Sequence, residues 1–317
     1  MKNKKLKIVF AGTPEFAVPT LCRLNEEGNQ ILLVLTQPDR KAGRGMILKS
    51  SPVKQKAQEL DIPIFQPDKL SNPDVYQVIK DINADVLIVV AYGLIIPIKI
   101  LDIFTKGAYN VHASLLPAWR GAAPIHRAIE AGDSKIGVTI MSVVLELDAG
   151  DIVRKEDIDL DKNANTGEIT KLISKLGAKL MSIVIKDIED NKNLKLIKQN
   201  ESMVTYANKI QKCEAKIIWN KVKSEVLIRK INAFNPFPGV FCIFKSKILK
   251  FWKAQMKNKD GQWEPGKFYL NPEKNNLFVG TVDGVIEVTL IQLEGKRKMS
   301  AKDFIVANNI DGSEYLL

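Results

Sequence analysis

Short, wholly apolar runs separated by helix-like segments are the feature that most restricts the fold of this chain. Three of these runs are Ile8–Ala11, Ile31–Leu35 and Val86–Val90, and no polar residue interrupts them. Continuous apolar runs of this length are typical of strands buried on both faces of a parallel sheet. Strands that alternate with helices predict a Rossmann-like, doubly wound and mostly parallel α/β sheet, in which ligands bind beyond the carboxyl ends of the strands.

Helix signals stand between and after these runs. Thr13 is expected to cap a first helix, Pro19 to kink it and Gly28 to end it. Thr166 is expected to cap a longer helix, whose apolar residues recur at helical spacing as far as Val184.

The strand predicted for Ala108–His112 carries the first candidate site. Side chains two residues apart on a strand point to the same face, so Asn110 and His112 are expected to project side by side at the strand end. An amide donor beside an imidazole suits the stabilisation of an oxyanion and the handling of a proton. We therefore interpret the pair as the centre of an acyl-type transfer, in which an amine attacks a carbonyl group.

Asp148 is the candidate third member of this set. Its carboxylate would favour the protonated imidazole of His112 and help to relay the proton lost by the amine. The competing interpretation is a core histidine near a polar loop, with Asp148 as a turn residue. Spacing alone favours the competing interpretation, because nothing in the sequence brings Asp148 to His112. The other histidine, His126, is expected to be a packing or surface residue.

Other kinds of site have little support in the sequence. The three cysteines form no Cys-x-x-Cys pair, so neither a metal site nor a disulfide framework is expected, and a reduced, cytoplasmic compartment is predicted. The longest apolar stretch, Val86–Ile98, contains Pro97 and is too short to span a bilayer. The segment from Gly261 to Lys267 resembles a phosphate-binding loop, but Phe268 stands where a Ser or Thr would hold magnesium.

Positive charge is concentrated in the last part of the chain. Residues 1–190 hold 25 basic and 24 acidic residues, a net charge of +1, whereas residues 191–317 hold 22 and 12, a net charge of +10. Such an excess suits a surface that neutralises phosphate, so the second part is expected to bind nucleic acid. The alternative is that these lysines only keep a small domain soluble.

The loop from residue 36 to residue 51 is also basic, glycine-rich and long. It is interpreted either as an arm that touches phosphate or as a solvated loop.

The second part of the chain has a different pattern. Short β-like runs between Val240 and Leu293, with a tight hairpin at Asp283-Gly284, predict a small OB-like β-barrel. Ser300 is expected to cap a last helix. The sequence therefore predicts a Rossmann-like domain over residues 1–189, a linker over residues 190–206 and a basic OB-like domain over residues 207–317.

Segments spread over nearly the whole chain match one known pattern. They are Phe10–Ala17, Thr36–Arg40, Ala42–Gly45, Ser51–Lys54, Val89–Ile95, His112–Pro117, Trp119–Ile125, Gly137–Met141, Leu147–Asp151, Val204–Ala207 and Ala233–Pro236. Through them the chain resembles the methionyl-tRNA formyltransferase family, whose enzymes depend on 10-formyltetrahydrofolate. The Asn-x-His and Ser-Leu-Leu-Pro features are shared with other formyl-folate enzymes, whereas the basic Gly-Arg-Gly loop and the C-terminal domain point to the tRNA branch. Ala113 stands where glycine also occurs in relatives.

The resemblance implies transfer of a formyl group from 10-formyltetrahydrofolate to the α-amino group of methionine on initiator tRNA, for translation initiation. It implies catalytic roles for Asn110, His112 and Asp148, and entry of the loop of Arg44 into the acceptor-stem region. The implied folate contacts are Ser114, Leu115, Leu116 and Pro117. The candidate tRNA contacts are Arg40, Lys41, Arg44, Lys296, Arg297 and Lys298. No metal and no membrane partner are implied, and the enzyme is expected to be a monomer.

Two alternatives belong to other functional classes. The first is another folate-dependent formyltransferase, which acts on an amino sugar or a nucleotide precursor; the basic second part of the chain argues against it. The second is a non-enzymatic RNA-binding module with a degenerate Rossmann-like domain. The set of Asn110, His112 and Asp148 argues against this alternative.

Overall fold

The computed structural model describes residues 5–42, 45–257 and 261–317. The chain divides into two compact units. The first unit comprises residues 1–124, 135–158 and 170–207, and the second comprises residues 125–134, 159–169 and 208–317. Residues 190–206, the expected linker, lie in the first unit. In the described residues no helix is long and apolar enough to cross a membrane.

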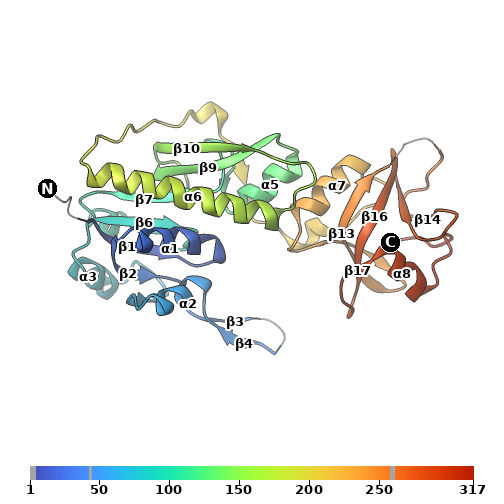
Figure 1. Cartoon of the computed structure of the whole chain (residues 1–317), viewed down its shortest axis with the longest axis horizontal. Helices are drawn as coiled ribbons and strands as arrows, with labels where there is room; N and C mark the ends of the chain where they lie inside the picture. Colours follow the sequence, from blue (N-terminus) through green and yellow to red (C-terminus); the bar gives the residue numbers. More distant parts are fainter. Residues whose placement is uncertain (1–4, 43–44, 258–260) are drawn as a thin grey trace. The chain divides into compact units, whose positions relative to one another are not determined.

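A mostly parallel sheet forms the centre of the first unit (Figure 1). In the described residues its strands follow the order β10-β9-β7-β6-β1-β2-β5. Their bounds are β1 Lys7–Gly12, β2 Gln30–Leu35, β5 Ile64–Phe65, β6 Val86–Val90, β7 Ala108–His112, β9 Lys135–Ser142 and β10 Ile152–Asp159.

The topology of this sheet is doubly wound. Strands β1, β2, β5, β6 and β7 pair in parallel, whereas β9 is antiparallel to β7. The chain proceeds outward from β1 to β2 and β5 on one side, and then to β6 and β7 on the other side. This reversal confirms the predicted Rossmann-like fold. In folds of this kind, ligands generally bind at the carboxyl ends of the strands beside the reversal, which here lies between β1 and β6.

The predicted apolar runs are confirmed as central strands. Every residue of β6 is buried, as is every residue of β1 except Lys7. Side chains of β1, β2 and β6 share one hydrophobic cluster with residues of the neighbouring helices. Removal of this much apolar surface from water is the main force that holds such a sheet together.

Helices and small ribbons surround the sheet. The helical segments are η1 Glu15–Ala17, α1 Val18–Glu26, α2 Pro52–Glu59, α3 Pro73–Asp81, α4 Ile98–Leu101, α6 Thr166–Glu189 and η2 Glu201–Met203, and the ribbons are β3 Arg40–Ala42 with β4 Ile47–Lys49 and β8 Arg120–Gly121 with β11 Tyr206–Ala207. All of helix α5 Pro124–Ala131 except its first residue belongs to the second unit. Helix α6 packs closely on the sheet, because a Cβ atom at Gly177 would lie 2.5 Å from Cγ1 of Val111 in β7. Figure 1 shows the β3–β4 ribbon extending away from the sheet.

Three local predictions about helices were wrong. Pro19 does not kink a helix, because α1 begins at Val18 and its first turn tolerates proline. Thr13 caps no helix, and its hydroxyl instead donates to the Tyr92 carbonyl at 2.9 Å. Thr166 was predicted to cap α6, but the cap is Asn165, whose Oδ1 accepts from the Glu168 amide at 3.1 Å.

An antiparallel sheet dominates the second unit. In the described residues its order is β12-β13-β16-β15-β14, with β17 paired to β16. Its elements are η3 Lys212–Ala215, α7 Ser224–Ala233, β12 Val240–Phe244, β13 Lys247–Met256, β14 Phe268–Leu270, β15 Leu277–Thr281, β16 Gly284–Leu293, β17 Met299–Ser300 and α8 Ala301–Asn308. The predicted turn at Asp283-Gly284 joins β15 to β16, and Ser300 caps α8 by accepting from the Asp303 amide at 3.1 Å.

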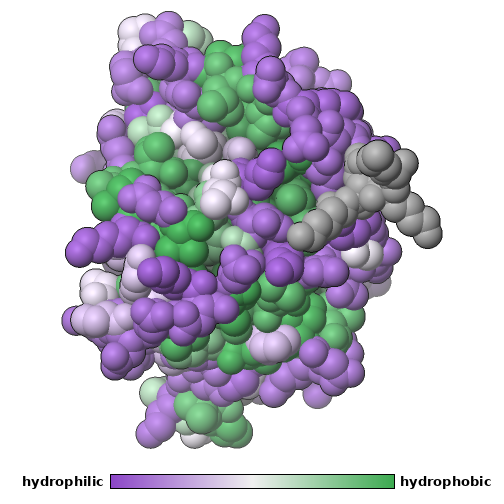
Figure 2. Space-filling view, turned by 90° about the vertical axis from the view of Figure 1, so that its left-hand side faces the viewer, coloured by the Kyte–Doolittle hydropathy of each residue, from purple (hydrophilic) through white to green (hydrophobic). Residues whose placement is uncertain are grey.

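Hydrophobic groups do not form a continuous apolar face on the side of the molecule drawn in Figure 2. There, hydrophobic patches are separated by hydrophilic side chains. Scattered apolar exposure of this kind is normal for a protein surface and points to no binding site by itself.

Candidate active site

His112 is the last residue of β7 and is almost completely buried, with 5% of its surface exposed. Its Nε2 atom lies 3.0 Å from the carbonyl oxygen of Trp119. A carbonyl oxygen can only accept a hydrogen bond, so Nε2 is the donor in this contact. The Trp119 carbonyl therefore fixes the orientation of the ring.

The structure brings Asp148 to the other side of the same ring. Asp148 lies in the loop between β9 and β10, and its Oδ1 is 3.5 Å from Nδ1 of His112. Its Oδ2 accepts a hydrogen bond of 2.8 Å from the amide of Gly121. The carboxylate is thus held by β8 while it faces the imidazole.

Asn110 lies in the same strand, two residues before His112, so both side chains share one face of the sheet. Its residue is partly exposed, and its backbone is paired with Val89 in β6 and Met141 in β9. Within the described residues no hydrogen bond engages its carboxamide. The amide group is therefore available to donate to a bound oxygen atom.

The predicted folate-contacting segment follows His112 directly. Ser114 and Leu116 are buried, and the Ser114 hydroxyl donates to the Ala118 carbonyl at 2.6 Å. The Leu116 amide donates to the hydroxyl of Thr139 in β9 at 3.1 Å. Leu115 and Pro117 are partly exposed. Ser114 and Leu116 thus shape the turn, while Leu115 and Pro117 have surface free for a ligand.

Two residues that support this site, Arg120 and Gln199, were not predicted from the sequence. Arg120 is 1% exposed, and its guanidinium donates to Gln199 Oε1 and to Glu201. Gln199 in turn donates to the carbonyls of Asp148 and Gly150, both at 2.8 Å. A charged residue inside the apolar segment after Trp119 was a signal that could have drawn attention to Arg120. No sequence pattern marks Gln199.

The second histidine has no such partners. His126 lies in α5 of the second unit, where burial and the neighbouring Arg127 lower the pKa of its imidazole. This environment agrees with its interpretation as a packing residue. The described residues contain no group of three or more His, Cys, Asp or Glu side chains placed to hold a metal ion.

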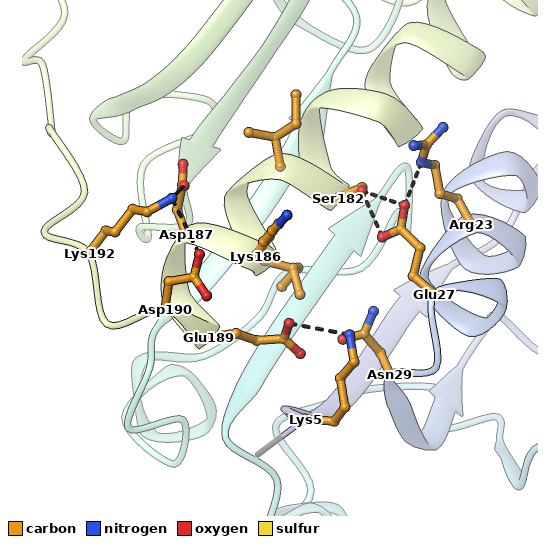
Figure 3. A pocket seen from close by; sticks show the side chains of 12 residues that line it. Lys5, Arg23, Glu27, Asn29, Ser182, Lys186, Asp187, Glu189, Asp190 and Lys192 are labelled. Atoms are coloured by element: carbon orange, nitrogen blue, oxygen red, sulfur yellow. Dashed lines mark hydrogen bonds and ion pairs between the residues drawn. The ribbon is translucent and has the colours of Figure 1, made fainter. Parts of the chain in front are cut away.

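One hollow of the first unit lies away from His112, between α1 and α6 (Figure 3). Its volume is about 670 Å³. Its charged side chains are largely paired with each other: Lys5 with Glu189, Arg23 with Glu27, and Lys192 with Asp187 and Asp190. We assign no function to it, because these pairs leave little charge for a ligand.

Two groups of basic residues correspond to the predicted tRNA contacts. In the β3–β4 ribbon, Arg40 and Lys41 are exposed, whereas the predicted contact Arg44 lies outside the described residues. In the second unit, Lys296, Arg297 and Lys298 lie in the turn between β16 and β17, and all three are exposed.

Trp252 is the centre of a cationic group in the second unit. The Lys298 ammonium lies 3.5 Å from the centroid of the Trp252 ring, and the Lys250 ammonium lies 5.6 Å from it. Partial burial, with a contribution from Lys250, lowers the pKa of Lys298. Two ammonium groups on one indole make a compact positive site on the surface of the antiparallel sheet.

Comparison with known proteins shows the family of this chain. The formyl transferase family model matches residues 4–185, and the model of the formyl transferase C-terminal domain matches residues 209–309. Among curated proteins, the methionyl-tRNA formyltransferase of Methylobacillus flagellatus is 44% identical over 96% of this chain and 97% of its own length. That of Polynucleobacter asymbioticus is 42% identical over 98% of both chains.

Solved structures share the fold at lower identity. HypX from Aquifex aeolicus, in complex with tetrahydrofolic acid, superposes with a TM-score of 0.65 at 16% identity over 99% of this chain and 51% of its own. WlaRD, a sugar 3N-formyl transferase, gives a TM-score of 0.66 at 20% identity over 93% of this chain and 100% of its own. Matches over both units and almost the full length lead to one conclusion: the chain belongs to the formyltransferase family, together with the methionyl-tRNA formyltransferases.

Proposed function

We propose that this protein transfers the formyl group of 10-formyltetrahydrofolate to the α-amino group of methionine on Met-tRNA, with initiator tRNA as the natural acceptor. The observation that carries the proposal is the similarity of 42–44% identity to methionyl-tRNA formyltransferases over 96–98% of the chain. The arrangement of His112 and Asp148, 3.5 Å apart at the end of a central strand, supports it.

The reaction needs alignment more than it needs a strong nucleophile. The α-amino group has a pKa of about 7.7–8.0, so a fraction of it is already in the reactive neutral form near neutral pH. The folate supplies a formyl carbon that is open to attack by this amine. The N–C bond to the amine forms, the bond to the folate nitrogen breaks, and one proton moves from the amine to that nitrogen. The protein has to position both reactants and manage charge.

Asn110 is proposed to stabilise the negative charge that develops on the formyl oxygen. Its carboxamide is not engaged elsewhere in the described residues and shares the sheet face of His112. A preorganised amide donor in a partly buried site stabilises an oxyanion better than water does, because it does not have to reorient during the reaction.

His112 and Asp148 are proposed to manage the proton. Because Nε2 of His112 donates to Trp119, Nδ1 is the ring nitrogen left to face Asp148. A proton released by the amine can be held between Nδ1 and the Asp148 carboxylate before it passes to the leaving nitrogen.

Folate and tRNA are proposed to contact different parts of the chain. Leu115 and Pro117 offer apolar surface next to His112, while Ser114 and Leu116 hold the turn beneath them. Arg40 and Lys41 of the ribbon, the undescribed Arg44, and the cluster Lys296, Arg297 and Lys298 are the proposed tRNA contacts. We also propose that the enzyme works as a monomer in the cytoplasm, where charged tRNA is found.

The direct test mixes the purified protein with 10-formyltetrahydrofolate and Met-tRNA, and detects formyl-methionine after hydrolysis of the tRNA ester. Formyl-methionine is expected with initiator Met-tRNA and in much smaller amounts with elongator Met-tRNA. A reaction without folate is the blank. Formylation of a nucleotide-linked amino sugar, with none of Met-tRNA, would contradict the proposal and favour the sugar-modifying alternative.

A further inference from the structure

The segment after α6 contacts the candidate active site at two points. Residues 197–207 belong to the first unit and run beside both loops that hold His112. Ile197 forms an antiparallel bridge with Ile152, just after the loop of Asp148. Tyr206–Ala207 pairs in parallel with Arg120–Gly121, just after Trp119.

The contact beside Tyr206–Ala207 holds Trp119, whose carbonyl orients His112. The Trp119 amide donates to Thr205 Oγ1 at 2.9 Å, and the Arg120 amide donates to the Thr205 carbonyl at 2.9 Å. Trp119 has a φ of 64°, a left-handed conformation that is unfavourable for a bulky residue. Such a conformation persists only where the surroundings enforce it. Thr205 is part of those surroundings.

The contact near the Ile197 bridge is made by Gln199 and holds the backbone of Asp148. Gln199 Nε2 donates to the carbonyls of Asp148 and Gly150, both at 2.8 Å. Gln199 Oε1 accepts from Nε and Nη2 of Arg120, at 3.1 Å and 2.9 Å. Asp148 also has a left-handed φ, of 53°. The Gln199 amide is therefore fixed at both ends, and its nitrogen is directed at the loop of Asp148.

We propose that Gln199 and Thr205 are positioning residues for the pair of His112 and Asp148. Each acts on one partner of the imidazole: Thr205 on the Trp119 carbonyl, and Gln199 on the Asp148 loop. The inference rests on the proposed function, since it matters only where His112 and Asp148 take part in turnover. Displacement of a reacting group by about 1 Å is enough to lower a rate by roughly 10²-fold.

Two substitutions remove these hydrogen bonds with little change in shape. Gln199→Glu keeps an acceptor for Arg120 but replaces the donor that faces two carbonyls by an oxygen. Thr205→Val removes the acceptor Oγ1 and keeps the branched side chain. We expect each variant to lower kcat for Met-tRNA formylation by about 10-fold or more, with KM for both substrates unchanged. Thr205→Ser, which keeps the hydroxyl, is expected to restore kcat.

Ser202→Ala provides the matched control. Ser202 lies in the same segment, and its hydroxyl bonds only to the neighbouring Asn200 in the described structure. We expect this variant to keep the wild-type kcat and the wild-type pH profile of kcat. Gln199→Glu and Thr205→Val are expected to change that profile, because they alter the site that holds the proton. Should Gln199→Glu fail to fold, Gln199→Met removes the same donor without adding charge.

A double-mutant cycle separates this inference from the proposed function. Gln199→Glu is expected to add little to the loss caused by Asp148→Asn, because residues that act as a unit are not additive. Full turnover by Asp148→Asn would overturn the catalytic assignment, and this inference with it. Loss of turnover in Asp148→Asn, with wild-type kcat and pH profile in Gln199→Glu and Thr205→Val, would overturn only the inference.

Discussion

The two ring nitrogens of His112 have different surroundings, and this difference defines what the residue can do. Nε2 is 3.0 Å from a backbone carbonyl, which is an ordinary hydrogen-bond length. Nδ1 is 3.5 Å from a carboxylate oxygen, so that contact is looser. The looser side of the ring suits a group that exchanges a proton during a reaction.

The first prediction concerns the residues proposed to act on the substrates. Asn110→Ala and His112→Ala are each expected to lower kcat by at least ~10²-fold, the scale for loss of one oxyanion donor. Turnover is measured by formation of formyl-Met-tRNA at saturating folate. His126→Gln, which changes the histidine of α5, serves as the control and is expected to retain turnover. Near-normal rates in both Asn110→Ala and His112→Ala would refute the assignment.

A second prediction concerns pH and one ion pair of the second unit. Arg127 contacts both carboxylate oxygens of Glu214, at 2.8 Å and 3.1 Å, and lowers the pKa of Glu214. A lowered pKa in the folded state adds stability above the pKa of the unfolded chain, and this stability is lost as pH falls through the folded value. The contribution should therefore be complete above about pH 5 and fade below about pH 4.

Urea unfolding of Glu214→Gln tests this account. The variant is expected to be less stable than the wild type by about 1 kcal/mol at pH 7, and the difference should shrink in acid. Glu225→Gln removes an exposed partner of Arg229 in α7 and should change stability much less. A difference for Glu214→Gln that stays constant from neutral to acid pH would show that the ion pair is not its cause.

At the scale of elements, the β3–β4 ribbon was the main departure from expectation. A loop was expected over residues 36–51, but Arg40–Ala42 and Ile47–Lys49 pair as antiparallel strands. The ribbon exposes Ile47 and Leu48, at 65% and 62%, beside Arg40 and Lys41. Alternating burial cannot reveal a strand pair that is solvated on both faces, which is why its sequence resembles a loop.

The third prediction follows from the charge on this ribbon. The double change Arg40→Ala and Lys41→Ala is expected to weaken Met-tRNA binding by about 10-fold at low salt, because two phosphate-neutralising groups are removed. Folate binding should not change. Lys171→Ala with Lys175→Ala removes the same charge from α6, where both lysines are exposed, and is the control. Equal loss of tRNA affinity in both double variants, measured by filter binding, would show that only net charge matters.

Central strands could be predicted from sequence, as could the cap of α8 at Ser300, whereas the starts of α1 and α6 could not. A run such as Val86–Val90 is buried on both faces, so its apolar pattern carries the information. Asn165 and Thr166 are adjacent polar residues, and either could have capped α6. Asn165 bonds to the first turn of the helix, whereas the Thr166 hydroxyl donates to the distant Ala233 carbonyl at 2.6 Å. Contacts between residues far apart in sequence decide such choices, and local patterns do not record them.

At the scale of the whole molecule, charge is divided between the two parts of the chain. Residues 191–317 carry +10 of the total of +11, while the remainder is nearly neutral. Such a division suits an enzyme in which one part holds a polyanion and another carries out chemistry on its end.

The fourth prediction concerns salt. Affinity for tRNA should fall linearly with salt on logarithmic axes, and Lys250→Gln with Lys298→Gln should flatten the slope by about one unit for each phosphate that is no longer neutralised. Glutamine keeps much of the side-chain stem over Trp252, so packing is preserved. Lys171→Ala with Lys175→Ala should leave the slope as it is in the wild type. An affinity independent of salt would refute the electrostatic account.

The candidate site shows how far sequence reasoning reaches at this scale. Asn110 and His112 could be paired because a strand dictates which side chains share a face. The approach of Asp148 to 3.5 Å depends on the path of a loop, which spacing does not determine. Gln199 is even harder to predict, because the carbonyls that it contacts, those of Asp148 and Gly150, are 51 and 49 positions away in the sequence.

The position of residues 197–207 determines where the chain can be truncated to give a catalytic fragment. The match to the catalytic family model ends at residue 185, which invites truncation there. A chain severed at that point would lack Gln199 and Thr205, and the left-handed turns at Trp119 and Asp148 would be without hydrogen bonds that brace them. A catalytic fragment that keeps its geometry has to extend to Ala207, where the last backbone bonds to β8 are made.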